Sequence, residues 1–258
     1  MSVKISFSNQ KGGAAKTTSS AICAWLLSKE GKKVLAVDMD GQANLTETLT
    51  LADAAETFGD QTVMEAMISA DPTPYIVKVT ENLHLLPSDE YLSRLASFLY
   101  QHLSAGDRAT RLRNTLQKVD EDYDYILIDT PPSLGEHTIN SVAASDYVIV
   151  MFEPSKYCYN AIPRFLNFCR DVSEINPDLD VAGILCTKMD FRRSDIKDLY
   201  DLLKDEYGDL VFDSYVKHRA ATGRIAFDGF EDNEELRYAV DQYKRVIKEF
   251  KKRVNKDG

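Results

Sequence analysis

The sequence has 258 residues, of which 44% are hydrophobic and 28% are charged, with a formal net charge of -10 at pH 7. This composition is typical of a globular protein, and the length suffices for one large core or two small ones. The longest apolar runs, residues 21–27 and 147–152, are far shorter than the ~20 residues that a membrane-spanning helix needs. Residues 1–13 predict a strand that enters a glycine-rich loop rather than a secretory signal, so we expect a cytoplasmic protein.

Cysteine usage and charge exclude further classes. The cysteines lie in apolar stretches without a C-x-x-C pair or a neighbouring histidine cluster, which predicts reduced core residues rather than a metal site. They are Cys23, Cys158, Cys169 and Cys186. The acidic balance argues against a protein that coats nucleic acid with its whole surface, although a local basic face can still bind phosphates.

Short β-rich runs alternate with helical patterns along the chain, and no repeat, low-complexity tract or linker interrupts them. The alternation predicts one domain over residues 1–258 of the α/β class, with three α/β/α layers around a mostly parallel, twisted sheet. Most of the predicted strands are continuous apolar runs, as expected for strands buried on both faces. They are residues 3–9, 33–38, 83–87, 125–129, 147–152, 181–187 and 210–216.

Apolar residues at three-to-four spacing predict the covering helices. These are residues 17–29, 90–103, 109–118, 159–175 and 195–206. An amphipathic final helix, at about 232–255, starts at a capping box formed by Asp232 and Glu235. Its apolar stripe predicts docking on the body and consists of Leu236, Val240, Tyr243, Ile247, Phe250 and Val254. Its other face becomes basic toward the end, which fits either a solvated face or a binding patch.

The first predicted strand runs into the sequence QKGGAAKTT at residues 10–18, and a helix follows directly. This is the setting of a phosphate-binding P-loop, and it predicts a sheet of the P-loop NTPase type. In such a loop the backbone N–H groups of residues 13–16 surround phosphate oxygens, aided by the positive end of the helix dipole. Lys16 would neutralise the β- and γ-phosphates, Thr17 would offer its hydroxyl to Mg²⁺, and Thr18 would reach the α-phosphate.

The loop departs twice from the pattern G-x-x-x-x-G-K-[ST], because Gln10 replaces the first glycine and Ala15 replaces the second. We expect Ala15 to be tolerated, because the residue before the lysine enters the helix, where φ stays negative and a methyl group has room. A glycine-rich turn without a ligand is the alternative interpretation of this segment taken alone.

Two acidic motifs follow later strands at the carboxyl edge of the sheet, where α/β proteins bind ligands. Asp38 and Asp40 close the second predicted strand. A carboxylate there can orient water for attack on the γ-phosphate or hold a metal-bound water, whereas one of the two could merely cap the next helix. Asp129 ends the apolar run 125–129 as a Walker B acid does, and it would bind Mg²⁺ through water.

Together these motifs resemble the ParA/MinD family of deviant Walker ATPases, and ParA proteins of the Soj type in particular. The resemblance rests on K-G-G-x-x-K-T-T at 11–18, D-x-D-x-Q-x-N at 38–44 and I-D-x-P-P at 128–132, and it continues outside them. It implies ATP and Mg²⁺ as cofactors and a homodimer that closes around ATP. The nucleotide-binding residues that it implies are Lys11, Gly12, Gly13, Ala14, Ala15, Lys16, Thr17 and Thr18.

The resemblance also implies individual roles. Lys11 is similar to the family's signature lysine, which reaches across the dimer to the partner's phosphates. Asp40 would be the acid that positions water. Lys11, Lys16 and Asp40 would together form the catalytic set. Residues 188–190 and 216–219 would approach the adenine.

The chain departs from the family pattern beyond the P-loop as well. Gly41 and Ala43 stand where Pro and Gly are usual, and residues 215–230 match the late adenine and DNA segment poorly. The substitutions Ala15, Gly41 and Ala43 would slow turnover. Because the late segment matches poorly, the resemblance does not assign the DNA contacts.

The implied function is an ATPase that partitions plasmid or chromosomal DNA. It would be slow, stimulated by a ParB-like centromere-binding protein, and nucleoid-associated through nonspecific DNA. Candidate DNA contacts are the basic residues Arg219, Arg224, Lys248, Lys251 and Lys252. A MinD-like membrane-surface ATPase is the alternative, because the basic final helix could lie on anionic lipid. A module that holds ATP without cleaving it is another alternative. An enzyme like the nitrogenase iron protein would need two cysteines beside the phosphate site, and Cys158 and Cys186 do not lie in the sequence contexts of that family.

Overall fold

The computed structural model describes residues 1–230 and 234–254. Within them, a seven-stranded sheet has the order β3-β4-β2-β5-β1-β6-β7, and its pairings are parallel except that of β3 with β4. The strands are β1 (Val3–Ser8), β2 (Val34–Asp38), β3 (Val77–Lys78), β4 (Leu83–Leu86), β5 (Tyr125–Asp129), β6 (Tyr147–Phe152) and β7 (Asp180–Cys186). The first strand therefore lies inside the sheet, between β5 and β6.

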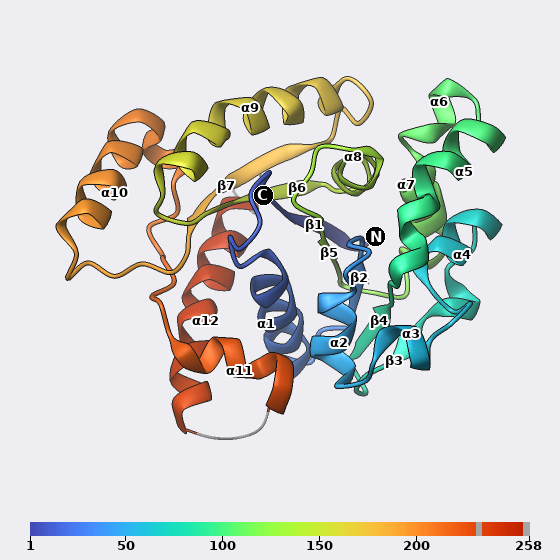
Figure 1. Cartoon of the computed structure of the whole chain (residues 1–258), viewed down its shortest axis with the longest axis horizontal. Helices are drawn as coiled ribbons and strands as arrows, with labels where there is room; N and C mark the ends of the chain where they lie inside the picture. The colour runs from blue at the N-terminus through green and yellow to red at the C-terminus, as the bar shows by residue number, and fades with distance from the viewer. Residues whose placement is uncertain (231–233, 255–258) are drawn as a thin grey trace.

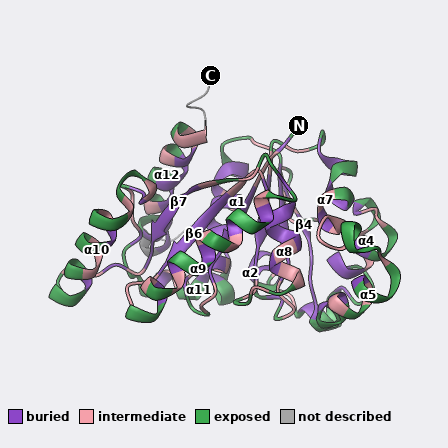
Figure 2. Cartoon of the chain, turned by 90° about the horizontal axis from the view of Figure 1, so that it is seen from above, coloured by how far each residue is buried: buried purple, intermediate pink, exposed green. Residues whose placement is uncertain are grey.

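Side chains that alternate along each strand build a core on both faces of the sheet. Leu127 in β5 packs with α1 and α12, whereas Ile126 and Ile128 pack with α5 and α7. One face is covered by α1 (Lys16–Lys29), α2 (Asn44–Thr50), α11 (Ala220–Asp228) and α12 (Glu234–Val254) (Figure 1). The other face carries α4 (Val63–Ser69), α5 (Leu95–His102), α7 (Arg111–Leu116), α8 (Glu136–Ala143), α9 (Lys156–Ser173) and α10 (Ser194–Tyr207). Figure 2 shows the buried strands between these helices, which confirms the predicted three layers.

Short helical segments complete the connections. They are α3 (Ala54–Thr57), α6 (Ala105–Arg108) and the 3-10 turns η1 (Thr73–Tyr75), η2 (Glu90–Arg94), η3 (Gln117–Val119) and η4 (Gly208–Leu210). The helix predicted at 90–103 is divided into η2 and α5, and the one at 109–118 becomes α7 followed by η3. Pattern reading overlooked α2, α4, α8 and α11, which have seven to nine residues, too short for a repeating apolar stripe.

The strand predicted at 210–216 is wrong. Residues 211 and 217 form only isolated bridges, with Ile184 and Met189. The N–H groups of Asp213 and Ser214 donate instead to the Glu249 carboxylate on α12, at 2.8 and 2.7 Å. Because these donors serve a side chain, they cannot extend a ladder along β7.

The docking predicted for the final helix is confirmed, because the stripe from Leu236 to Phe250 is buried against the body. Its centre is Tyr243, whose hydroxyl shares a 3.0 Å hydrogen bond with Ser19 on α1. The predicted capping box begins at Asp232, outside the described residues. Among the helices that the structure describes, none is long and apolar enough to cross a membrane.

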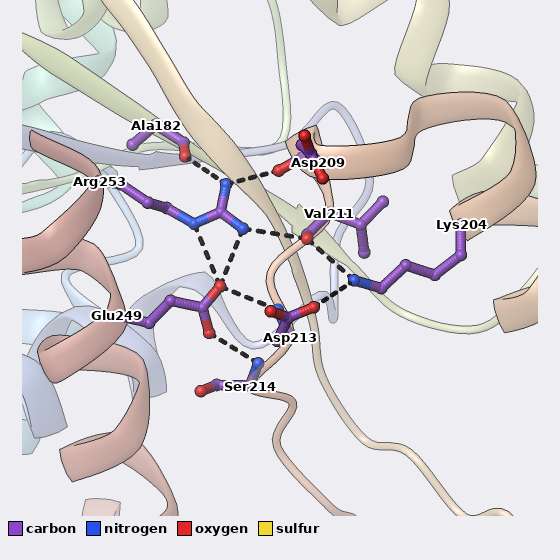
Figure 3. Close-up of polar contacts among 8 residues, drawn as sticks. All are labelled: Ala182, Lys204, Asp209, Val211, Asp213, Ser214, Glu249 and Arg253. Carbon is purple, nitrogen blue, oxygen red and sulfur yellow. Dashed lines mark hydrogen bonds and ion pairs between the residues drawn. The ribbon is translucent and has the colours of Figure 1, made fainter. Parts of the chain in front are cut away.

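Arg253 fastens the far end of α12 to the sheet (Figure 3). Its Nη2 donates to Glu249 Oε1 at 2.8 Å, and its Nε donates to the same oxygen at 3.1 Å. The guanidinium also donates to three backbone carbonyls, at 3.2, 2.8 and 3.0 Å, those of Ala182, Asp209 and Val211. The planar fork of arginine suits such a multiple contact. Arg253 is one of the basic residues of the final helix, and these contacts make it a structural residue.

We expect Arg253→Ala to lower the free energy of unfolding by about 3 kcal/mol, because it removes the cation beside the half-buried Glu249 carboxylate and one donor from each of three carbonyls. Urea unfolding measures the change. Lys252→Ala, which removes the exposed neighbouring charge, is the matched control and should stay within about 0.5 kcal/mol of wild type. Equal stability of the two variants would show that the network does not hold the helix.

Candidate nucleotide site

The carboxyl ends of β1, β2 and β5 meet at the centre of the sheet and bring the three sequence motifs together. Asp38 in β2 is in register with Asp129 in β5, and β1 delivers the P-loop on the other side of β5. A cavity of about 780 Å³ opens in front of them. Its lining includes Gly12, Gly13, Lys16, Thr17, Thr18 and Asp40. The sheet topology therefore brings these motifs together at one edge, as predicted.

Asp129 and Thr17 fit a magnesium ion. Thr17 Oγ1 donates to Asp129 Oδ2 at 2.6 Å, which turns the lone pairs of the hydroxyl away from the carboxylate. The other oxygen, Oδ1, is buried and has no hydrogen-bond partner in the described part of the chain. Burial, together with the nearby Asp38 carboxylate, raises the pKa of Asp129 well above its usual range. A buried carboxylate oxygen without a donor is suited to a cation-bound water.

The two acids after β2 have different surroundings. Asp38 is fully buried and accepts hydrogen bonds from Thr46 N and Thr46 Oγ1 at 2.9 and 2.8 Å, so it anchors the first turn of α2. It also accepts from the N–H of Asp40 at 3.1 Å, which fixes the turn that carries Asp40. Asp40 is half-buried and lines the cavity. Asp38 is therefore the structural acid, and Asp40 is the one that a ligand can reach.

Both lysines of the P-loop lie close to the cavity. Lys16 is buried, and its Nζ donates to the Lys11 carbonyl at 3.3 Å. Burial lowers the pKa of Lys16, against the opposing effect of Asp129 and Asp40. The Lys11 ammonium group turns back onto its own chain, where it donates to Ser155 Oγ at 3.2 Å and lies 5.9 Å from the centre of the Tyr157 ring.

Ala15 does not have the negative φ that the sequence analysis expected. Its φ and ψ are 59° and 28°, which is the left-handed region, and it stands directly before the first residue of α1. Ala43, the other alanine at a usual glycine position, also has a positive φ, of 53°. Each alanine thus adopts a backbone conformation that glycine takes readily, at a cost of about 1–2 kcal/mol.

The wall opposite the acids consists of segments that the sequence analysis assigned only through the family resemblance. Lys188 and residues 216–219 line the cavity, and Asp190 lines two smaller neighbouring pockets. Their approach to the adenine stays a prediction. The N–H of Lys217 donates to Gln242 Oε1 on α12 at 2.7 Å. The sequence did not assign roles to Thr46 and Gln242. Thr46 acts through Asp38, eight residues before it, and Gln242 acts through Lys217, 25 residues before it.

The candidate DNA contacts fall into two groups. Arg219 lines the cavity at the start of α11, and the exposed Arg224 lies one turn further along that helix. Lys248, Lys251 and Lys252 lie near the other end of α12. Lys251 forms an ion pair with Glu30 at 2.6 Å, whereas Lys248 and Lys252 are exposed.

Comparison with known proteins shows the family of the chain. A family described as "AAA domain" matches residues 2–181. The chain is 34% identical to the sporulation initiation inhibitor protein Soj of Bacillus subtilis over 82% of this chain and 83% of that protein. It is 31% identical to the chromosome-partitioning ATPase Soj of Thermus thermophilus, over 81% and 78%.

Solved structures share the fold, and two of them hold a nucleotide. A putative plasmid partition protein of Borrelia burgdorferi bound to AMPPNP has a TM-score of 0.83 and 28% identity, and the match covers 98% of this chain and 99% of that one. A cobyrinic acid a,c-diamide synthase of Mycobacterium smegmatis with bound ADP and magnesium has a TM-score of 0.80 and 31% identity, with 96% of each chain covered. The fold and site define a P-loop ATPase, and the chain belongs to the ParA/Soj family.

Ala15→Gly should raise the free energy of unfolding by about 0.5–1 kcal/mol, because relief of the left-handed strain exceeds the entropy that glycine adds to the unfolded chain. Ala14→Gly is the matched control, since Ala14 is buried and has no positive φ, and it should instead destabilise. Thermal or urea unfolding without nucleotide compares the two. A less stable Ala15→Gly variant would contradict the strain argument.

The pKa of Asp38, which burial raises from 3.8 to about 6, predicts a pH dependence. Because the folded chain holds this proton more tightly than the unfolded chain, the stability that it contributes is full below about pH 3.8 and is lost as the pH rises through about 6. From about pH 4.5 to about pH 7, wild type without nucleotide should lose about 2 kcal/mol relative to Asp38→Asn. Parallel pH profiles of unfolding free energy for the two proteins would refute this.

Proposed function

We propose that the protein is an ATP-dependent partition ATPase that dimerises around Mg-ATP and acts in plasmid or chromosome segregation. The observation that carries the proposal is the unpartnered Asp129 Oδ1 beside the Thr17 hydroxyl, at the foot of a P-loop in a ParA/Soj-family chain. Thr17 and Asp129 would hold Mg²⁺ in this site, Asp129 through water. The ion supplies charge that stabilises the phosphate oxygens during transfer.

The other residues of the site have separate roles in phosphate binding, water activation and dimer formation. Lys16 neutralises phosphate charge, and the N–H groups of Gly13 to Lys16 bind phosphate oxygens. Asp40, held by the Asp38 hydrogen bond to its N–H, orients the attacking water. Lys11 leaves Ser155 and reaches the phosphates of the partner subunit, so that the nucleotide becomes part of the dimer interface. Hydrolysis is slow until a ParB-like centromere-binding partner stimulates it.

The DNA-binding surface that we propose uses the basic side chains of α11 and α12. Arg219 and Arg224 form one patch near the nucleotide, and Lys248, Lys251 and Lys252 form the second. Binding of nonspecific DNA by such patches would give a cytoplasmic, nucleoid-associated protein, because phosphate contacts carry no sequence information. The cargo and its adaptor are recognised elsewhere.

The packing of α12 argues against the membrane-surface alternative. A helix that lies on lipid must present its apolar face to the bilayer. In this protein that face is buried against α1 and β7, from Leu236 to Phe250. Only the basic side of the helix remains for a partner, and phosphate-bearing DNA suits that side.

The deciding experiment is size measurement with Mg-ATP, together with DNA retention and phosphate release, on wild type, Lys16→Ala and Asp40→Ala. Wild type should form a dimer that retains DNA. Lys16→Ala should stay monomeric, because it loses the phosphate contact. Asp40→Ala should keep the dimer while phosphate release falls by about 100-fold. ATP binding without any dimer or DNA complex would refute the switch and favour a module that holds ATP without cleaving it.

The same retention assay tests the two DNA patches. Arg219→Glu with Arg224→Glu changes one patch, and Lys248→Glu with Lys252→Glu changes the other. Lys251 and Arg253 are left unchanged because they have structural partners. Each reversal should weaken retention and lower the slope of affinity against salt by about one for each phosphate contact that is lost. Unchanged affinity and salt slope for both variants would remove these patches from the proposal.

A further inference from the structure

The P-loop is held by Thr187 and Lys188, the two residues that follow β7. Lys188 Nζ donates to the carbonyl oxygen of Gly13 at 2.5 Å. Glu153, just after β6, keeps this ammonium group in place, with its Oε1 3.8 Å from the nitrogen. The Lys188 backbone has a φ of 54°, an unfavourable conformation for a lysine that requires support from its surroundings.

The peptide geometry gives this contact a consequence for phosphate binding. In a planar trans peptide the C=O and the N–H point in opposite directions. Because Lys188 holds the Gly13 carbonyl on its own side, the N–H of Ala14 in the same peptide points to the opposite side. In a P-loop, backbone N–H groups that face the centre of the loop bind phosphate oxygens.

We propose that Lys188 is a positioning residue for phosphate binding, which fixes the Gly13–Ala14 peptide so that its N–H faces the phosphates. The proposal rests on the ATP binding proposed above. The loop sequence does not select this orientation by itself, because Gly12 and Gly13 lack the Cβ that would restrict rotation of the peptide. Lys188 supplies the missing restriction from outside the loop.

A second anchor acts on the next peptide. The hydroxyl of Thr187, which is fully buried, lies 3.3 Å from the Ala14 carbonyl and 3.1 Å from the Phe152 carbonyl, so it shares one proton between them. By the same geometry, its bond to Ala14 directs the N–H of Ala15 inward. Two consecutive peptides of the phosphate loop are thus oriented by two consecutive residues of a distant strand end.

The test measures binding of inorganic tripolyphosphate with Mg²⁺, and of Mg-ATP, to wild type and Lys188→Met by calorimetry. Tripolyphosphate has no base or ribose, so it reports on the phosphate cradle alone. Lys188→Met should lose about tenfold in affinity for both ligands. Lys156→Met, which removes an exposed lysine from the first turn of α9 at the same end of the sheet, controls for charge and should change affinity by less than about twofold.

Amide hydrogen exchange without nucleotide gives a readout that does not involve a ligand. Residues 11–16 should exchange faster in Lys188→Met than in wild type, because the Gly13–Ala14 peptide can then rotate. Thr187→Val changes no charge and should weaken tripolyphosphate binding by about threefold, which keeps the proposal testable even if Lys188→Met folds poorly.

Three results would overturn the proposal. A loss of ATP affinity with unchanged tripolyphosphate affinity would mean that Lys188 contacts the base or ribose directly. Equal losses in Lys188→Met and Lys156→Met would reduce its role to overall charge, and unchanged exchange and binding in both Lys188→Met and Thr187→Val would remove the anchors. Wild type that binds neither ligand would instead refute the proposed function itself.

Discussion

The structure depends on two carboxylates buried side by side in the middle of the sheet. Asp38 and Asp129 are in register on neighbouring strands, and burial raises the pKa of both. Asp38 accepts hydrogen bonds from Thr46 and from the N–H of Asp40, whereas Asp129 has one oxygen without a donor in the part of the chain that the structure describes. Burial of a carboxylate is unfavourable unless donors or a cation compensate for its desolvation. The fold thus places one well-compensated acid and one poorly compensated acid side by side at the carboxyl edge of the sheet.

The last helix, α12, is part of the nucleotide pocket rather than an appendage. Gln242 accepts the N–H of Lys217, and Glu249 accepts those of Asp213 and Ser214. The segment at 211–217 is therefore held from two sides. Its N–H groups donate to α12 side chains, and those of Phe212 and Val216 donate to carbonyls of β7. The Arg253 contacts at the far end of α12 keep that helix in register with the pocket.

The alanines at glycine positions show how tertiary contacts can overrule local preference. Ala15 has a left-handed backbone although it carries a Cβ. The carbonyl before it, that of Ala14, accepts a hydrogen bond from the Thr187 hydroxyl. The Ala15 carbonyl accepts one from the N–H of Ser19. These contacts hold Ala15 in a conformation that is locally unfavourable for a residue with a Cβ, at a cost in stability.

The sequence alone determined the features that depend on local periodicity and on motifs: the buried strands, the P-loop, Asp129 and the apolar stripe of the final helix. The tertiary structure decided the features that depend on partners far along the chain. Among these are the division of roles between Asp38 and Asp40, the absence of a ladder at 210–216, the structural role of Arg253 and the contact of Lys188 with Gly13. The physical reason is that a pattern of residues reports which face of an element is buried, whereas a hydrogen bond is set by the position of its partner, and only the folded chain determines that position.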